Sequence, residues 1–512
     1  MKTDVVVVGG GPCGLLSALL LGRLGISTVL LEKHQEILEH PKAMGITRRT
    51  AEIFLQTGLL EQMLQGRPAK DPDATSQWLK DGLNGTILGQ VRYEDAPCPY
   101  SSCQPFRCPQ PHVERVLRAG LAQQPSVRAL YGTSAQSVRE QSDSVAIAIS
   151  AAGSHEEIEA KFVVAADGDR SPIRQQLGIE RAGPGEKGRF LSVYFRADYA
   201  RELAGRVGLI SNVLGADFFE VFVAVNGTDL WLMHHYLQDG ESAQDYSPQS
   251  FVPIIQYTSG MPQVPVEVLS VNPWVMAPAI AKRWRQGRVF LVGDAAARVS
   301  PSGGLGMNNG LQSAHNLAWK LAQVVQGRQP LDWLDTYAAE RLPAARFTFA
   351  NSEGNADEIT EIIERAFGGD WDGARQVIAH SRRAGHGYGQ DFGIVYESAA
   401  VHPDASDAAL PIDPVNDYVP QGRPGHRAPD FLIQDDKGQS MSVLKRFGYQ
   451  FTALLAAQAP DDLLSSFCPD AVLLREGVDF QVQSTQWREI YGVSDKGGVL
   501  IRPDGYIAAR VA

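Results

Sequence analysis

The sequence has few cysteines, and they do not form a recognisable framework. Five cysteines occur among 512 residues, and a small odd number favours a reducing compartment over a disulfide-stabilised secreted fold. Cys98, Cys103 and Cys108 are evenly spaced, yet no CxxC pair or nearby histidine completes a zinc pattern. We therefore expect no metal site.

Long apolar runs and an excess of positive charge are also lacking. The apolar stretch near the start, residues 15–22 (LLSALLLG), is too short to span a bilayer, and no cleavage-site pattern accompanies it. The net charge of −11 argues against a nucleic-acid binder, which needs a basic surface. We expect a cytoplasmic protein, a monomer or homodimer, that binds neither membranes nor nucleic acid.

Apolar residues are abundant enough for more than one core. They make up 44% of a chain whose length predicts two or three domains. Residues 4–33 (DVVVVGGGPCGLLSALLLGRLGISTVLLEK) read as a buried strand, a glycine turn, a helix and a second buried strand. This βαβ unit predicts an α/β fold, to which residues 145–150, 160–167 and 288–294 add further strands.

Two other segments have a different residue pattern. Residues 218–237 contain β-branched and aromatic runs around Asn226-Gly227, a hairpin signal that predicts an inserted antiparallel sheet. From about residue 396 the chain is loop-rich, and it ends in a predicted hairpin around Pro503-Asp504-Gly505. We interpret this last part as a separate C-terminal domain.

The first glycine loop matches the GxGxxG pattern at Gly9, Gly11 and Gly14. In a strand-turn-helix setting these glycines allow a tight turn, close approach of a pyrophosphate and close helix packing. Glu32, at the end of the second strand, is placed to accept hydrogen bonds from an adenosine ribose and would repel the 2′-phosphate of NADP. The pattern predicts dinucleotide binding but does not distinguish FAD from NAD.

Two later motifs also follow predicted strands. Residues 165–174 (AADGDRSPIR) place Asp167 at a strand end, and residues 293–310 (GDAAARVSPSGGLGMNNG) do the same for Asp294. Ligands of open α/β sheets bind at this edge. The glycines at 303, 304 and 306 precede a helix expected to begin near Leu311, whose free N–H groups would favour negative charge on a ring system.

The three motifs in this order resemble the single-component FAD-dependent aromatic hydroxylases, which include phenol, hydroxyphenylpropionate and polyketide-tailoring hydroxylases. The resemblance continues through residues 40–54, 109–117, 306–322, 424–430 and 500–510. It implies a Rossmann-like FAD-binding domain, an inserted antiparallel substrate-binding sheet and a C-terminal thioredoxin-like domain. The predicted bounds are 1–72, 98–178 and 272–395 for the first, 73–97 and 179–271 for the second, and 396–512 for the third.

The resemblance also implies which residues bind FAD. On the adenosine and phosphate side they are Gly11, Pro12, Cys13, Gly14, Glu32 and Lys33, with Asp167 linked to FAD and NAD(P)H binding. On the flavin side they are Lys42, Gln110, Asp294, Gly304, Gly306, Met307 and Asn308, with Pro301 beside the ring and facing substrate. Read singly, Met307 fits a core position, Asn308 a helix cap, and Lys42 or Arg49 a solvated charge.

The substrate would lie between the flavin and the inserted sheet. Polar candidates on its wall are His234, His235 and Tyr236, and we name His235 as the possible substrate contact. Neighbouring strand residues point to opposite faces, so His234 and His235 cannot both face the pocket. For each of the two, a structural or solvated role is the commoner alternative.

The activity implied by the resemblance is hydroxylation of a phenolic or polycyclic aromatic substrate. NAD(P)H would dock transiently and reduce FAD, O2 would add to give a flavin hydroperoxide, and one oxygen atom would pass to the ring. Baeyer–Villiger oxygenation of a polycyclic ketone and a non-catalytic FAD-binding protein remain alternatives. A halogenase is disfavoured because no WxWxIP motif is present.

Three positions depart from the family pattern. Ala297 stands where histidine is usual, Ser313 where aspartate is frequent, and Asp430 where histidine is common. None of these changes removes a predicted phosphate contact. The C-terminal segment has the isolated Cys468 and no CxxC, so a dithiol redox role is unsupported.

Overall fold

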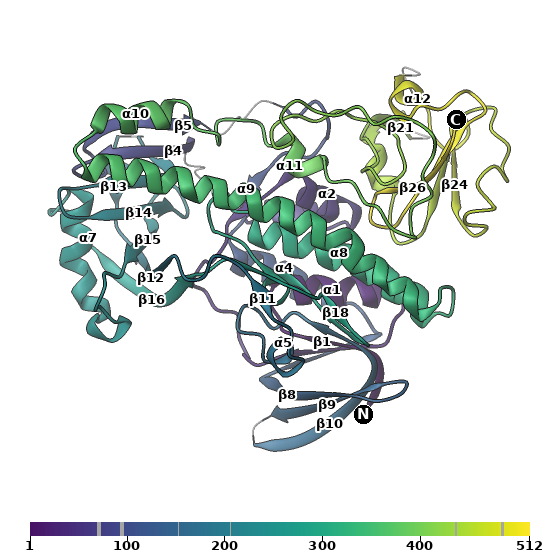
Figure 1. Ribbon diagram of the computed structural model, residues 1–512, viewed down its shortest axis with the longest axis horizontal. Helices are drawn as coiled ribbons and strands as arrows, with labels where there is room; N and C mark the ends of the chain where they lie inside the picture. Colours follow the sequence, from purple (N-terminus) through teal and green to yellow (C-terminus); the bar gives the residue numbers. More distant parts are fainter. Residues whose placement is uncertain (69–72, 93–96, 152, 205, 436–437, 483–485) are drawn as a thin grey trace.

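The computed structural model describes residues 1–68, 73–92, 97–151, 153–204, 206–435, 438–482 and 486–512, and it confirms the predicted α/β class. Three lobes are visible in Figure 1: a central one built on a parallel sheet, an antiparallel sheet on the left, and a C-terminal lobe on the right. No helix in the described part of the chain is long and apolar enough to cross a membrane.

The central lobe is organised by a sheet with strand order β18-β19-β10-β1-β2-β7, in which β19 through β7 are parallel. Residues 5–8 of β1 are buried on both faces of the sheet, which explains their uninterrupted valine run. The strands are β1 (Lys2–Val8), β2 (Thr28–Glu32), β7 (Val127–Tyr131), β8 (Thr133–Glu140), β9 (Val145–Ala151), β10 (Ser154–Ala165), β18 (Arg285–Gln286) and β19 (Val289–Leu291).

The helices of this lobe pack beside the sheet and on one another, with α1 lying against both α4 and α8. They are α1 (Pro12–Arg23), α2 (Arg48–Gln56), α3 (Leu60–Leu64), α4 (Gln110–Leu121), α5 (Pro172–Gln176), α8 (Gly306–Val325) and α9 (Asp335–Phe367). Short strands complete it: β3 (Gly45–Ile46), β6 (Phe106–Arg107), β11 (Arg181–Ala182), β17 (Ala279–Ala281) and β20 (Ala297–Arg298).

The second lobe is the predicted antiparallel sheet, with order β16-β12-β15-β14-β13-β4-β5 and one parallel pair, β13 with β4. Its strands are β4 (Asp73–Lys80), β5 (Thr86–Arg92), β12 (Gly188–Arg196), β13 (Gly208–Leu214), β14 (Phe219–Ala224), β15 (Leu230–Tyr236) and β16 (Glu267–Met276). Its helices are α6 (Tyr199–Glu202), α7 (Phe251–Ser259) and α10 (Trp371–Ala379). The long helix α9 runs from the central lobe to this sheet (Figure 1).

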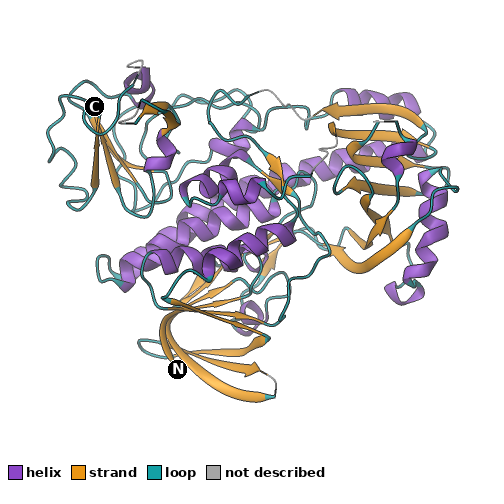
Figure 2. Cartoon of the chain, turned by 180° about the vertical axis from the view of Figure 1, so that it is seen from behind, coloured by secondary structure: helices purple, strands orange, loops and turns teal. Residues whose placement is uncertain are grey.

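The C-terminal lobe contains a four-stranded sheet of order β24-β23-β25-β26 and a two-stranded one. Its elements are β21 (Leu432–Gln434), β22 (Ser440–Ser442), β23 (Thr452–Leu455), β24 (Val472–Arg475), α12 (Gln486–Tyr491), β25 (Gly498–Ile501) and β26 (Ile507–Val511), after α11 (Tyr388–Phe392) in the connection. The predicted hairpin at Pro503-Asp504-Gly505 joins β25 to β26. Figure 2 shows this lobe from behind, at the end of the molecule opposite the antiparallel sheet.

One element differs from expectation. Helix α8 begins at Gly306, five residues before the predicted start at Leu311. Gly303 and Gly304 have φ angles of 113° and 66°, which complete the turn from the preceding loop. Gly306, Met307 and Asn308 therefore lie in the first turn of the helix and not in the loop before it.

The domain bounds remain predictions. The first of them, between residues 72 and 73, falls beside residues 69–72, which lie outside the described part of the chain.

Candidate functional site

The first glycine loop is open at the one position where a ligand would need space. A Cβ added at Gly9, whose φ is 109°, would lie 2.2 Å from the carbonyl oxygen of Ala166, and one at Gly14 would lie 1.9 Å from that of Gly9. At Gly11 nothing lies within 4 Å. Since α1 begins immediately afterwards with Pro12, its free N–H groups can receive a pyrophosphate there.

Glu32 ends β2 beside this loop, and the backbone holds its carboxylate. Oε2 accepts a hydrogen bond from the Gly10 N–H at 2.6 Å, and Oε1 accepts one from the His34 N–H at 2.8 Å. Each oxygen keeps a further lone pair for a ligand hydroxyl. Lys33, the next residue, is exposed.

Cys13 packs the first glycine loop, at residues 9–14, against the third motif, at residues 293–310. Its Sγ lies so close to Gly293 and Gly310 that an added Cβ would approach it to 3.1 Å and 2.4 Å, respectively. Burial raises the pKa of the thiol, so Cys13 stays protonated and acts as a packing residue. The two loops, far apart in sequence, therefore form one surface.

The two predicted aspartates both lie at this surface. Asp167 Oδ2 accepts a hydrogen bond from the Ile173 N–H at 3.2 Å, whereas its Oδ1 is buried with no partner among the described residues. A buried acceptor of this kind needs a donor, and a ligand hydroxyl would be one. Asp294 is exposed, and desolvation by the surrounding protein together with the negative charge of Asp169 raises its pKa.

Sequence reasoning missed two arginines beside Asp294. Arg181 and Arg298 both bind the carboxylate of Asp169, and Arg181 Nη2 donates to the carbonyl oxygen of Asp294 at 3.3 Å. Both cations lower the pKa of Asp294. Asp169 was visible in the motif AADGDR, but no local pattern marks the arginines, which come from other segments.

Lys42 and Gln110 lie on neighbouring segments of the central lobe. The Gln110 N–H donates to the carbonyl oxygen of Ala43 at 2.8 Å, and its side chain donates to Glu114 at 2.8 Å. Lys42 is exposed. Desolvation raises the pKa values of both Asp294 and Glu114, and the positive charge of Lys42 opposes this shift in each case.

Asn308 holds the loop before α8 against the segment before α2 through hydrogen bonds. Its Oδ1 accepts a hydrogen bond from the Thr47 N–H at 3.0 Å, and its Nδ2 donates to the carbonyl oxygens of Gly45 and Gly304, both at 2.9 Å. The amide is therefore used by protein groups.

The loop that carries Pro301 adjoins the antiparallel sheet. Pro301 is exposed, and the neighbouring Ser300 Oγ lies 4.0 Å from the sulfur of Met276 in β16. Gly304 is open in front of α8, while Met307 is half-buried and packs on the main core. Pro301 thus lies in a loop that adjoins the antiparallel sheet.

One face of the antiparallel sheet is turned toward the central lobe. Ser192 and His234 are directly paired across β12 and β15 and share this face. His40 of the central lobe bonds the hydroxyls of Ser192 (3.0 Å) and Ser270 (2.8 Å). The face that contains His234 is therefore the one that contacts the central lobe.

Aromatic rings extend this face. Phe190 stacks on Trp274 with ring centroids 4.4 Å apart and meets Tyr236 edge-on at 5.3 Å. His234 packs edge-on against Trp274 at 5.7 Å. Together Phe190, His234, Tyr236 and Trp274 form what we call the aromatic wall.

His235, predicted as the possible substrate contact, points to the sheet face opposite that of His234. Its Nδ1 lies 2.6 Å from Glu220 Oε1, and its ring packs on Phe251 of α7. The prediction that only one of the two histidines faces the pocket is consistent with this alternation. Strand parity alone could not tell which face α7 covers.

His234 is the histidine with unused hydrogen-bonding capacity. Its Nδ1 is buried without a partner among the described residues. Burial, reinforced by His40, lowers its pKa to about 4, so the ring is neutral at physiological pH.

Of the three departures from the family pattern, Ala297 and Ser313 are buried and Asp430 is half-buried. Ala297 in β20 is buried, which leaves no room for an imidazole without displacement of its neighbours. Asp430 joins the C-terminal lobe to the loop at Ser102, accepting hydrogen bonds from the Ser102 N–H at 2.7 Å and the Ser442 hydroxyl at 2.6 Å. Ser313 Oγ accepts a hydrogen bond from Arg341 Nε at 3.1 Å.

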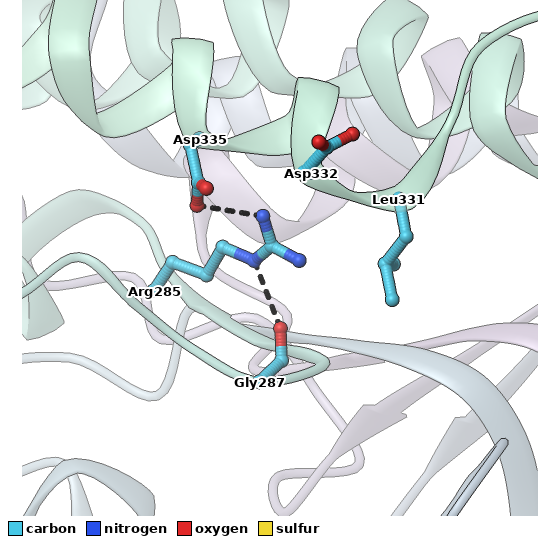
Figure 3. Close-up of a pocket in the computed structure, with 5 residues that line it drawn as sticks. All are labelled: Arg285, Gly287, Leu331, Asp332 and Asp335. Atoms are coloured by element: carbon cyan, nitrogen blue, oxygen red, sulfur yellow. Dashed lines mark hydrogen bonds and ion pairs between the residues drawn. The ribbon is translucent and has the colours of Figure 1, made fainter.

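A separate surface hollow of about 460 Å³ shares no residue with this site. Figure 3 shows its lining, with Arg285 held by Asp335 Oδ1 at 2.7 Å and by the carbonyl oxygen of Gly287 at 2.9 Å. Leu331 and Asp332 complete the lining. Because its guanidinium is already bound, the hollow offers no prepared anion site.

Comparison with known proteins gives a consistent result. A family model described as "FAD binding domain" matches residues 2–352. The chain is 30% identical to a putative polyketide hydroxylase of Streptomyces halstedii, over 99% of this chain and 93% of that protein. It is also 30% identical to 4-methyl-5-nitrocatechol 5-monooxygenase of a Burkholderia species, over 100% and 94%.

Solved structures show the same similarity. A complex of aklavinone-11 hydroxylase with FAD and aklavinone superimposes with a TM-score of 0.85 at 28% identity, covering 99% of this chain and 95% of that one. The flavin-dependent monooxygenase PieE has a TM-score of 0.93 at 24% identity, covering 100% and 96%, which shows a shared fold.

Proposed function

The chain belongs to the FAD-binding-domain family of flavoprotein monooxygenases, and we propose that it uses NAD(P)H and O2 to hydroxylate a phenolic or polycyclic aromatic substrate. The observation that carries the substrate assignment is the aromatic wall. It lies on the sheet face that contacts His40 of the central lobe, and Nδ1 of its His234 has no partner among the described residues.

FAD fits the residues present. The open space at Gly11, the held carboxylate of Glu32 and the unpartnered Oδ1 of Asp167 match a pyrophosphate and two hydroxyl-bearing groups. Asp294 would bind the ribityl or pyrophosphate region, and the first turn of α8 would lie at the ring edge. When bound, FAD supplies the oxygen-activating chemistry, while the protein orients the substrate and excludes water.

We assign His234 as the acceptor for the substrate hydroxyl. A ring of pKa about 4 is too weak a base to hold the proton of a phenol, but its neutral Nδ1 can accept a hydrogen bond from it. That hydrogen bond makes the aromatic ring more electron-rich and fixes its orientation. The hydrogen bond between His40 and Ser192 supports the strand beside His234.

Replacing His234 with phenylalanine should lower kcat/KM for a phenolic substrate by about 10- to 100-fold, because the ring shape remains but the acceptor is lost. FAD affinity should not change. Steady-state kinetics and flavin titration check both statements. In the wild-type protein, His234 should contribute no ionisation near pH 6.5 to the pH profile.

His235→Gln is the matched control, because glutamine can still bond Glu220 on the opposite face of the sheet. It should retain wild-type kcat/KM. Full activity of His234→Phe, or an equal loss of kcat/KM in both variants, would show that His234 does not bind the substrate.

The proposed function predicts that the protein purifies yellow with FAD and oxidises NAD(P)H faster when a substrate is present. A panel of phenols and polycyclic quinones, analysed by mass spectrometry, should give a hydroxylated product one oxygen atom heavier. A lactone or ester product would identify Baeyer–Villiger oxygenation. NAD(P)H consumption no higher than that of free flavin with every compound would indicate a non-catalytic FAD-binding protein.

A further inference from the structure

Arg341 of α9 is a buried cation held by neutral groups. Its Nε donates to Ser313 Oγ at 3.1 Å and its Nη1 to the hydroxyl of Tyr396 at 2.9 Å. Its Nη2 donates to the carbonyl oxygen and to Oδ1 of Asn309, at 3.2 Å and 2.8 Å. Only 1% of the residue is exposed.

Neighbouring buried cations have a different environment. Arg49 and Arg427 share the carboxylate of Glu52, and Lys320 and Arg502 share that of Glu340. Arg341 forms no ion pair with any carboxylate in the described part of the chain.

The charge on Arg341 persists despite this burial. Guanidinium groups keep their proton in proteins, and nearby Tyr396, Tyr506 and Tyr337 raise the pKa of Arg341 against the effect of burial. A buried charge without a counter-charge is costly. Its field therefore acts strongly on whatever lies close to it in the interior.

The nearest functional element is the N-terminus of α8. Asn309 belongs to the first turn of this helix, and one turn rises about 5 Å, which places the guanidinium within about 10 Å of the free N–H groups at Gly306. Those N–H groups also carry the positive end of the helix dipole. Arg341 and the helix thus favour negative charge at the same place.

We propose that Arg341 raises the reduction potential of the bound flavin, and that Ser313 permits this by leaving the guanidinium without a carboxylate partner. The inference rests on the proposed FAD site at α8. Oxidised FAD is neutral at its ring. A hydride from reduced nicotinamide delivers two electrons and one proton, which leaves the reduced ring with one negative charge that a nearby cation stabilises.

The first test places a carboxylate beside Arg341. In Ser313→Asp the new charge should pair with the guanidinium and cancel much of its field, whereas the neutral Ser313→Asn has a similar volume. A unit charge about 10 Å away at an effective dielectric constant near 20 changes the equilibrium about tenfold, which is about 30 mV for a two-electron couple. Equilibration with a reference dye should show this decrease for aspartate and no change for asparagine.

A second pair alters Arg341 itself. Arg341→Gln removes the charge and should lower the potential by a similar amount, whereas Arg341→Lys retains the charge and should keep it. Thermal melting and FAD titration of all four proteins separate loss of folding or of cofactor from a true shift in potential.

The outcomes distinguish this inference from the proposed function. A wild-type protein that does not bind FAD contradicts the proposed function. FAD-loaded Ser313→Asp or Arg341→Gln with the wild-type potential, or a shift equal to that of the neutral or charge-conserving partner, overturns the role of Arg341 alone.

Discussion

The Gly11→Glu variant is expected to fold and to purify without FAD. Nothing lies within 4 Å of a Cβ at this position, so the side chain enters open space and does not strain the fold. Its carboxylate would occupy the cradle in front of α1 and repel the pyrophosphate. Because like charges in contact cost several kcal/mol, FAD affinity should fall by about 100-fold or more.

Absorbance of the purified protein and fluorescence titration of the apoprotein measure this loss. Thermal melting compares the Gly11→Glu apoprotein with the wild-type apoprotein. Gly14→Ala provides the contrast, because a Cβ there meets the carbonyl oxygen of Gly9 at 1.9 Å and must disturb the turn. It should destabilise the apoprotein, which Gly11→Glu should not. Normal FAD affinity in Gly11→Glu would show that the pyrophosphate binds elsewhere.

Replacing Arg502 with methionine should destabilise the protein by about 3–5 kcal/mol, the usual cost of breaking a buried ion pair. Arg502 donates to both oxygens of Glu340 at 2.7 Å and to Asp504 at 2.6 and 2.9 Å. The side chains of Arg502 and Glu340 are both fully buried. Without the arginine, two carboxylates are left to the single ammonium of Lys320, which bonds Glu340 at 2.6 Å.

Urea unfolding, followed with one signal from the C-terminal lobe and one from the whole chain, measures the change in the free energy of unfolding. The control is Arg365→Met, which removes an exposed pair with Glu361 and Asp370 and should have a far smaller effect. Equal effects of the two substitutions would mean that the buried cluster contributes no special stability.

Because of the same cluster, the stability of the protein should decrease at low pH. Arg502 and Lys320 hold the pKa of Glu340 well below its ordinary value, so its contribution is present above the unfolded pKa of about 4.3. This contribution is lost as the pH falls toward the pKa of the folded state. Wild-type stability should therefore decrease below about pH 4, and the decrease should be smaller in Glu340→Gln.

Elements with short-range signals were predictable. The strand, turn and helix around Gly9, Gly11 and Gly14 lie within one continuous segment, as does the hairpin at Asn226-Gly227. The start of α8 was predicted too late because glycines weaken the helical pattern, although the turn at Gly303 and Gly304 leads directly into the helix.

The pocket side of the antiparallel sheet was not predictable. Alternation implied that His234 and His235 face opposite ways, but only the packing of α7 on one face and the contact of His40 with Ser192 on the other assign each histidine. Those contacts join residues far apart in the chain, which periodicity cannot detect.

The sequence by itself determined the α/β class, the three motifs and their order, because each depends on neighbouring residues in one strand or turn. Tertiary structure alone decided that Cys13 joins two glycine loops and that Arg341 has Ser313 as a partner where a carboxylate is frequent. The physical reason is that desolvation and charge depend on every group packed around a side chain, and those groups come from distant segments.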